Sequence, residues 1–150
     1  MNATTAPQQP VPPAADEVPD VASVMSPVVA VDVQDSLWTA MDVMLTHGLR
    51  NLVVTHQGIA RGVLSDRDLA AAWAKDPLGL KHRRAEHALA PAQSFIGPDI
   101  DVVTAAARMR QLGVCALVVV ESTLVPLGVV TDRDLLDALT ALLRDTGRRS

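Results

Sequence analysis

Apolar side chains along the chain follow two spacings, one typical of helices and the other typical of strands. Leu37, Ala40 and Met44 recur at every third or fourth position and predict a helix with one buried face, begun by Asp35 or Ser36. Runs of valine, leucine and isoleucine predict strands. The predicted strands are residues 28–33, 52–55 and 59–64, and a second helix is predicted at residues 66–75.

The same order of strand, helix, strand, strand and helix is predicted again about 65 positions later. Val102, Ala105 and Met109 form the matching helical stripe, and Asp99 or Asp101 can begin that helix. Further strands are predicted at residues 94–96, 116–120 and 127–130. Because the offset between the copies stays between 64 and 66 positions, we interpret the chain as a two-copy repeat.

Each copy ends in one motif, GVLSDRDL at residues 62–69 and GVVTDRDL at residues 128–135. The motif passes from a strand into a helix, where Ser65 or Thr131 can cap the helix start through its hydroxyl. Three residues later, Asp68 or Asp134 can complete a capping box, and the cap is worth about 1 kcal/mol. A structural role alone would explain the hydroxyl and the carboxylate.

Capping does not explain Arg67 and Arg133. A cation in the first helical turn opposes the helix dipole, at a cost of about 0.3–1 kcal/mol. A bound anion would reverse the sign, because backbone amides, a hydroxyl and a guanidinium together form a phosphate site. The adjacent carboxylate can accept hydrogen bonds from a ribose diol, so the motif predicts a nucleotide. The alternative is a structural ion pair, from Arg67 to Asp66 or Asp68 and from Arg133 to its own neighbours.

Composition narrows the classes of function. The 150 residues carry a net charge of −4 and only 2% aromatic residues, which disfavours a nucleic-acid partner. Cys115 is the only cysteine, so no disulfide can form within the chain, and we expect a reducing, cytoplasmic setting. We expect no signal peptide, because no lysine or arginine precedes a long apolar run at the N-terminus, and no membrane span, because the longest apolar run, residues 114–120, is too short.

The repeats set the expected domain boundaries. Residues 21–75 and 85–143 form the first and second copies. Residues 1–20, rich in proline and alanine, are predicted to be a disordered tail. The basic cluster KHRR lies in residues 76–84, which we expect to be an exposed linker, and residues 144–150 are expected to be a basic tail.

Two tandem units of this pattern, each ending in glycine, two apolar residues and Ser/Thr-x-x-Asp, resemble a CBS domain pair, also called a Bateman module. The resemblance covers roughly residues 21–143. It implies an α/β fold in which two β-α-β-β-α repeats pack as a pseudo-two-fold sandwich. It also implies a cleft for each repeat, dimers of pairs, and ligands such as AMP, ADP, ATP, NAD-type molecules or S-adenosylmethionine.

Carried onto this sequence, the resemblance implies particular roles. Asp68 and Asp134 would bind ribose hydroxyls. Phosphate would meet Ser65 and Thr131 beside the motif residues Asp66, Arg67, Asp132 and Arg133. Adenine would meet the main chain of Val28 and Val29, with Asn51, Leu52 and Val53 on the opposite wall of that first cleft. The second-repeat equivalents would be Ala92 and Gln93, facing Ala116 and Leu117.

The repeats depart from the family pattern in places. The second has Ala90-Pro91 where the first has Ser26-Pro27, and Arg110 replaces Leu45 on the helical stripe. On these grounds we expect the first cleft to be the occupied one.

Two functions follow as hypotheses. The first is a non-catalytic regulator that needs no obligatory cofactor, binds a nucleotide or S-adenosylmethionine, and acts as a homodimer or through a protein partner. The second is a dimerisation scaffold with empty clefts. The four histidines lack acidic or cysteine companions at ligand spacing, so we expect no metal site. No Gly-x-Ser-x-Gly occurs, and we expect no catalysis.

Overall fold

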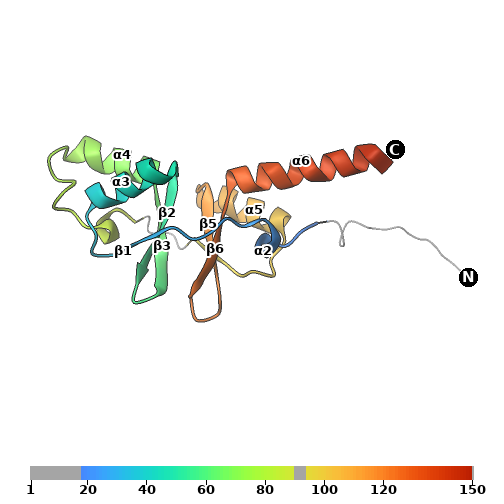
Figure 1. The fold of residues 1–150 in the computed structure, drawn as a ribbon, viewed down its shortest axis with the longest axis horizontal. Coiled ribbons are helices and arrows are strands. Elements are labelled where there is room, and N and C mark those ends of the chain that lie inside the picture. Colours follow the sequence, from blue (N-terminus) through green and yellow to red (C-terminus); the bar gives the residue numbers. More distant parts are fainter. Residues whose placement is uncertain (1–17, 90–93, 150) are drawn as a thin grey trace, which may run out of the picture.

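Two three-stranded sheets and their helices make up the computed structural model, which describes residues 18–89 and 94–149 (Figure 1). The elements of the first half are α2 (Val21–Val24), β1 (Ala30–Asp32), α3 (Leu37–His47), β2 (Asn51–His56), β3 (Ile59–Ser65) and α4 (Asp66–Lys75). Those of the second half are η2 (Ala85–Ala88), β4 (Phe95–Ile96), α5 (Val102–Leu112), β5 (Ala116–Val120), β6 (Pro126–Thr131) and α6 (Asp132–Arg149).

The two sheets have the same topology. In the first, β2 pairs in parallel with β1 and antiparallel with β3, with Val53 opposite Val63. In the second, β5 pairs in parallel with β4 and antiparallel with β6, with Val118 opposite Val129. Each antiparallel pair shifts register near its hairpin end. The repeat predicted from the sequence is thus confirmed, including its β-α-β-β-α order.

Local signals place the helix ends. The hydroxyl of Ser36 accepts the Thr39 amide at 3.0 Å, so Ser36 rather than Asp35 begins α3. Asp101 rather than Asp99 begins α5, where its carboxylate accepts the Thr104 amide at 2.7 Å. Both helices then end in a left-handed glycine, Gly48 and Gly113.

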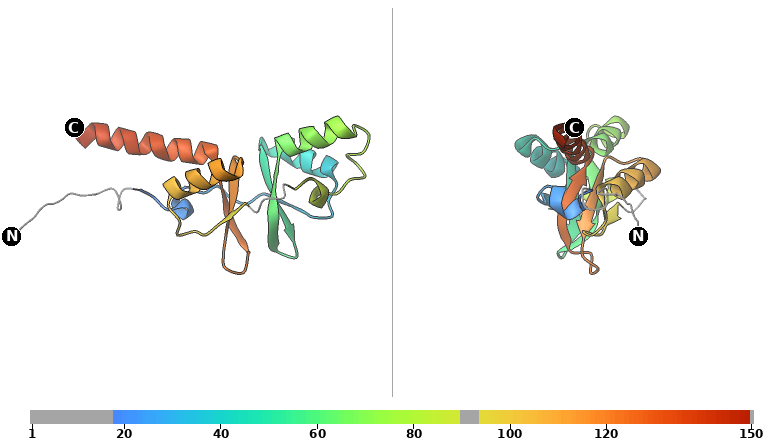
Figure 2. Two further views of the ribbon diagram at one scale, coloured as in Figure 1. Left: turned by 180° about the vertical axis from the view of Figure 1, so that it is seen from behind. Right: turned by 90° about the vertical axis from the view of Figure 1, so that its right-hand side faces the viewer.

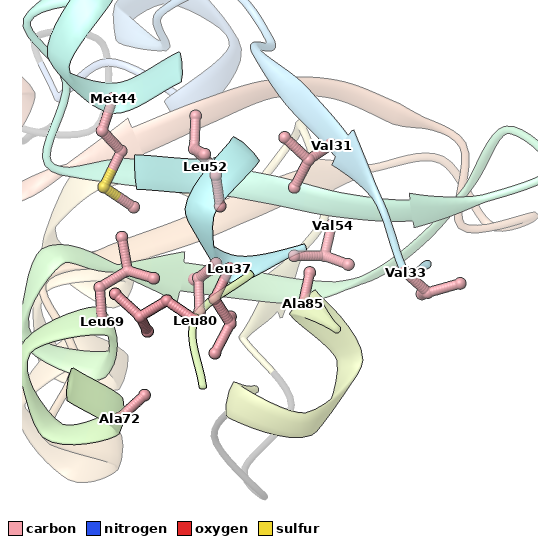
Figure 3. Close-up of a cluster of buried hydrophobic side chains, with 12 residues drawn as sticks. Val31, Val33, Leu37, Met44, Leu52, Val54, Leu69, Ala72, Leu80 and Ala85 are labelled. Carbon is pink, nitrogen blue, oxygen red and sulfur yellow. The ribbon is translucent and has the colours of Figure 1, made fainter. Parts of the chain in front are cut away.

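Three apolar clusters hold the fold together. In Figure 3, side chains from the first sheet, α3 and α4 meet in one cluster, which includes Leu37, Leu52 and Leu69. A matching cluster in the second repeat contains Leu117 and Val130. The third lies between the two sheets, whose strands β3 and β5 contact each other. The sheets therefore stand face to face in the middle of the molecule, with helices on the outside, as Figure 1 shows. The expected sandwich is confirmed.

The leading segment of each repeat packs on the other repeat. The amide of Val21, in α2, donates to the carbonyl of Ile100 at 2.8 Å. Ser26 then pairs with Val129 of β6 through two backbone hydrogen bonds. In the same way η2 returns to the first repeat, where the Ala85 amide donates to Asp35 at 2.7 Å. We call this reciprocal arrangement the segment exchange.

Several expected boundaries differ from the structure. The strand expected at residues 28–33 has the bounds Ala30–Asp32, although the Val29 carbonyl and the Val33 amide still form hydrogen bonds with β2 on either side of it. The linker expected to be exposed contains Leu80, which is 4% exposed and packs in the first cluster. The expected C-terminal tail is helical through Arg149, and α6 runs past the sheets at one end of the molecule (Figure 2).

Most of the predicted N-terminal tail, residues 1–17, lies outside the described residues. Its last residues are ordered. The carbonyl of Pro19 accepts the Val102 amide at 3.0 Å, and Asp20 forms a bridge to Asp101. The tail expected to end at residue 20 therefore joins the second repeat before α2 begins.

Candidate functional site

Both motifs fold as capping boxes at a helix start. In the first, the Asp68 amide donates to Ser65 Oγ at 3.1 Å and the Ser65 amide donates to Asp68 Oδ2 at 2.8 Å. In the second, Thr131 and Asp134 make the same pair of bonds at 3.2 and 2.9 Å. The structural role predicted for these residues is therefore present in both copies. Each box uses only one carboxylate oxygen.

The second carboxylate oxygen distinguishes the two copies. Ser26 Oγ donates to Asp134 Oδ1 at 3.0 Å. Among the described residues, Asp68 Oδ1 accepts no hydrogen bond. A ligand hydroxyl can therefore approach Asp68 directly, whereas at Asp134 it competes with Ser26.

A cavity of about 480 Å³, the first cleft, opens beside the first motif. Its floor is the start of α4, with Ser65, Asp66, Arg67 and Asp68. Its opposite wall comes from the second repeat, where the chain enters β5. The wall residues are Ser94, Leu112, Gly113, Val114, Cys115 and Ala116, and Arg50, Asn51 and Val63 complete the lining.

A smaller cavity of about 240 Å³, the second cleft, lies beside the second motif. Thr131, Asp132, Arg133 and Asp134 form its floor at the start of α6. The first repeat supplies its wall, with Ser26, Pro27, Val29, Gly48, Leu49, Arg50 and Asn51, beside Val129 of β6. The two clefts thus follow the pseudo-two-fold arrangement of the repeats.

The grouping of residues expected from the sequence is wrong in one respect. Val29 and the Ser26-Pro27 pair lie in the second cleft with Thr131 and Asp134, and not with Ser65 and Asp68. The segment exchange is the reason, since it carries the leading segment of the first repeat onto β6. The preference for the first cleft can therefore no longer rest on Ser26-Pro27. Asn51 lines both clefts, and Ala116 lines the first.

Other predicted residues lie away from the cleft surfaces. Leu52, Val53 and Leu117 are at most 1% exposed, and their side chains pack in the apolar clusters. Val28 packs against the cluster between the sheets. Ala92 and Gln93 lie outside the described residues.

The structural equivalent of Val29 is Ser94. The Val29 carbonyl accepts the Val53 amide at 3.0 Å, and the Ser94 carbonyl accepts the Val118 amide at 2.7 Å. Ser94 is 4% exposed and lines the first cleft. A buried hydroxyl therefore stands in the first cleft where the second cleft has an apolar side chain.

The ion pair considered for the motif arginines is not observed. Within the described part of the chain, neither Arg67 nor Arg133 pairs with a carboxylate, and each lines its own cleft. Asp66 pairs instead with Arg50, whose Nε lies 3.6 Å from Asp66 Oδ2. Each helix start thus presents a guanidinium without a carboxylate partner.

Arg50 and Cys115 also line the first cleft, although the sequence patterns did not place them there. They occupy equivalent positions, because the amides of Asp66 and Asp132 donate to the carbonyls of Arg50 and Cys115 at 2.9 and 3.0 Å. The offset of 65 residues already pairs them and could have identified both. The Cys115 thiol lies 3.9 Å from Asn51 Oδ1 at the wall of the first cleft.

An apolar groove of about 680 Å³ runs between α5 and α6. Its exposed side chains include Val103, Leu136 and Leu139, which are 51–64% exposed. On the first repeat, Trp38 and Trp73 are exposed on α3 and α4. The helices of both repeats thus carry apolar surface that the described residues leave uncovered.

Residues 18–89 and 94–149 contain no group of three or more histidine, cysteine, aspartate or glutamate side chains placed to hold a metal ion. None of their helices is long and apolar enough to cross a membrane.

Solved structures with this fold are numerous. The CBS domain pair of protein MJ0100, in complex with 5′-methylthioadenosine and S-adenosyl-L-methionine, matches 83% of this chain and 98% of its own, with a TM-score of 0.75 and 19% identity. A conserved CBS domain protein of unknown function from Thermoplasma acidophilum, TA0289, matches 84% of this chain and 75% of its own, with a TM-score of 0.73 and 22% identity.

The CBS domain of a bacterial CNNM/CorC family Mg²⁺ transporter, in complex with ATP, covers 81% of this chain and 87% of its own, with a TM-score of 0.69 and 21% identity. No curated protein matches the sequence. The family model for the CBS domain matches residues 20–75 and 94–141, one segment in each repeat. The chain therefore belongs to the CBS domain family and carries two tandem copies of the domain.

Proposed function

We propose that this chain is a non-catalytic regulatory module that binds an adenosine-containing ligand, with the first cleft as its principal site. The observation that carries the proposal is the second carboxylate oxygen of Asp68. It accepts no hydrogen bond among the described residues and lines a cavity of about 480 Å³. Ligand sites typically measure about 300–1,000 Å³, and the second cleft, at about 240 Å³, falls below that range.

The chemistry of the first cleft fits a nucleotide. A carboxylate accepts both hydroxyls of a ribose, and such charge-assisted bonds contribute about 1.5–3 kcal/mol each. The start of α4 and the Arg67 guanidinium suit a phosphate or another anionic group. Ser94 offers a hydroxyl to the polar edge of a base, beside the apolar side chains of Val63 and Ala116.

Two of the similar structures support the choice of ligand class. The MJ0100 domain pair holds 5′-methylthioadenosine and S-adenosyl-L-methionine, and the CNNM/CorC domain holds ATP. All three ligands contain adenosine.

The signal would be transmitted through a homodimer. The groove between α5 and α6 and the tryptophans of α3 and α4 are apolar, and a second copy would cover them. A ligand in the first cleft contacts the start of α4 and the end of α5, so binding can alter the helices that form this surface. Dimer shape would then be read by a protein partner, in a cytoplasmic setting.

A thermal-shift series with AMP, ADP, ATP, NAD, S-adenosylmethionine and GTP as a control tests the ligand class. A ligand at one hundred times its Kd stabilises the folded state by about 2.7 kcal/mol. For a chain of this size, the midpoint should rise by about 5–11 °C. We expect that rise with at least one adenosine ligand and not with GTP.

Calorimetric titration of Asp68→Asn and Asp134→Asn then locates the site. Asparagine still accepts the capping amide but presents only one acceptor oxygen, so Asp68→Asn should weaken the tightest binding about tenfold or more. Asp134→Asn is the matched control and should leave that step unchanged. Unchanged binding by Asp68→Asn, or no binding by the wild type, would reject the proposal.

The second candidate is a dimerisation scaffold with empty clefts. The small volume of the second cleft and the bond from Ser26 to Asp134 favour this reading for that cleft. A chain that dimerises but shows no thermal shift with any adenosine ligand at millimolar concentration would support the scaffold.

A further inference from the structure

We propose that Arg50 couples the two clefts, so that an anionic ligand in one cleft weakens the binding of an anionic ligand in the other. This inference rests on the proposed nucleotide function and adds a regulatory property to it. Among the described residues that line the clefts, Arg50 and Asn51 are the two that line both, and only Arg50 is charged.

The position of Arg50 follows from the strand that carries it. It directly precedes β2, where its carbonyl accepts the Asp66 amide at 2.9 Å and so joins the strand to the start of α4. The backbone of Arg50 is thus held beside the first motif. Arg50 lines both clefts, whose floors are the helix starts that carry Arg67 and Arg133.

The guanidinium is only loosely held. Its Nε lies 3.6 Å from Asp66 Oδ2, and the two side chains are 60% and 53% exposed. Ion pairs so open to solvent are weak. A ligand phosphate, which a guanidinium can bind through two parallel hydrogen bonds, can therefore replace Asp66 as the partner of Arg50.

One guanidinium cannot serve two phosphates equally. When the first cleft is filled, Arg50 can turn toward its phosphate, and a ligand in the second cleft then loses this contact. The second ligand also meets the negative charge of the first across the shared wall. Both effects oppose double occupancy, and both increase with the charge of the ligand.

The repeat explains why the coupling depends on a single residue. The position equivalent to Arg50 is Cys115, which is uncharged and lines the first cleft but not the second. The second repeat therefore places no second guanidinium at this position, and Arg133 is the arginine that a ligand in the second cleft keeps when Arg50 turns away. The chain is asymmetric at the place where a symmetric pair would carry two arginines.

Calorimetric titrations with ATP and with uncharged adenosine test the coupling. Two affinities of the second cleft are compared. One is measured in the wild type with its first cleft saturated, and the other in Asp68→Asn, whose first cleft is weakened. With ATP, the wild-type value should be weaker by about fivefold or more. With adenosine the two values should agree.

When Arg50→Gln is introduced into both the wild type and Asp68→Asn, the ratio of the two ATP affinities of the second cleft should come close to one. Arg108→Gln is the matched control and should preserve the ratio, because Arg108 is exposed on α5 and lines neither cleft. A ratio of one in the wild type with both clefts binding ATP, or a second cleft that binds no ATP in either background, would reject the coupling and leave the nucleotide function of the first cleft standing. A coupling that persists in Arg50→Gln would reject the role of Arg50. Absence of binding by every nucleotide would reject the proposed function, and the coupling with it.

Discussion

Replacing Gly128 with alanine should disturb the segment exchange directly. A β-carbon built at Gly128 would lie 2.5 Å from Met25 Sδ, 2.7 Å from Met25 Cγ and 3.0 Å from the Ser26 carbonyl oxygen. The methionine side chain can move, but the Ser26 carbonyl is held in place, because both the amide and the carbonyl of Ser26 form hydrogen bonds with Val129. The added methyl group must therefore push Met25 and Ser26 of the leading segment away from β6.

The expected cost can be derived from this crowding. Inserting a methyl group into a packed site costs about 1–3 kcal/mol. For a chain of 150 residues, this lowers the thermal midpoint by about 2–12 °C. Movement of Ser26 would also break its hydroxyl bond to Asp134 Oδ1, so any ligand binding in the second cleft should change as well.

The assay compares unfolding of the wild type, Gly128→Ala and the control Gly97→Ala. At Gly97 the nearest atom to the added β-carbon, Ile100 Cγ1, is 4.0 Å away, so this variant should stay within about 0.5 kcal/mol of the wild type. In a Met25→Ala background, Gly128→Ala should cost less than it does alone, because part of the obstacle is gone. Equal stability of the wild type and Gly128→Ala would refute the close contact between the leading segment and β6.

Two further predictions concern other parts of the molecule. The Thr104 amide holds the pKa of the Asp101 carboxyl below its ordinary value. The resulting stabilisation of the folded state is therefore complete above about pH 4 and is lost as the pH falls through the lower pKa of the folded state. The control is Asp101→Asn, because asparagine is an equally good helix cap that does not titrate. On acidification, the wild type should lose more thermal stability than this variant. Leu139→Glu places a charge in the groove between α5 and α6 and should convert a dimer to a monomer in sedimentation experiments. Leu78→Glu is the control, because Leu78 is 89% exposed and lies outside that groove. A wild type that sediments as a monomer would contradict the proposed dimer.

Local patterns predicted the elements well. The helix at residues 66–75 and the strand at residues 116–120 have the expected bounds, because the helix cap, apolar period and β-branched runs that define them are local in sequence. The capping boxes were also predictable, since the hydroxyl and carboxylate are three residues apart. The burial of Leu80 was not, because it lies in a short segment between a proline and the basic cluster and the contacts that cover it come from distant elements.

The composition of the clefts was predictable only in part. The motif residues form each floor as expected, but the wall of each cleft comes from the other repeat. Sequence spacing assigns Val29 to the repeat in which it lies, whereas the chain path carries it to the opposite motif. The repeat offset pairs Arg50 with Cys115, but the sequence does not show that Arg50 lines both clefts, because the two cavities form only in the folded chain.

The segment exchange also determines how the molecule can come apart. Each apolar cluster is completed by residues that come just before the other sheet in the chain: Val21, which precedes β1, belongs to the cluster of the second half, and Leu80 and Ala85, which precede β4, belong to that of the first. Cutting the chain between the halves would leave neither fragment with its full interior. The two repeats therefore depend on each other for their interiors, and they should unfold as a single cooperative unit despite their separate sheets.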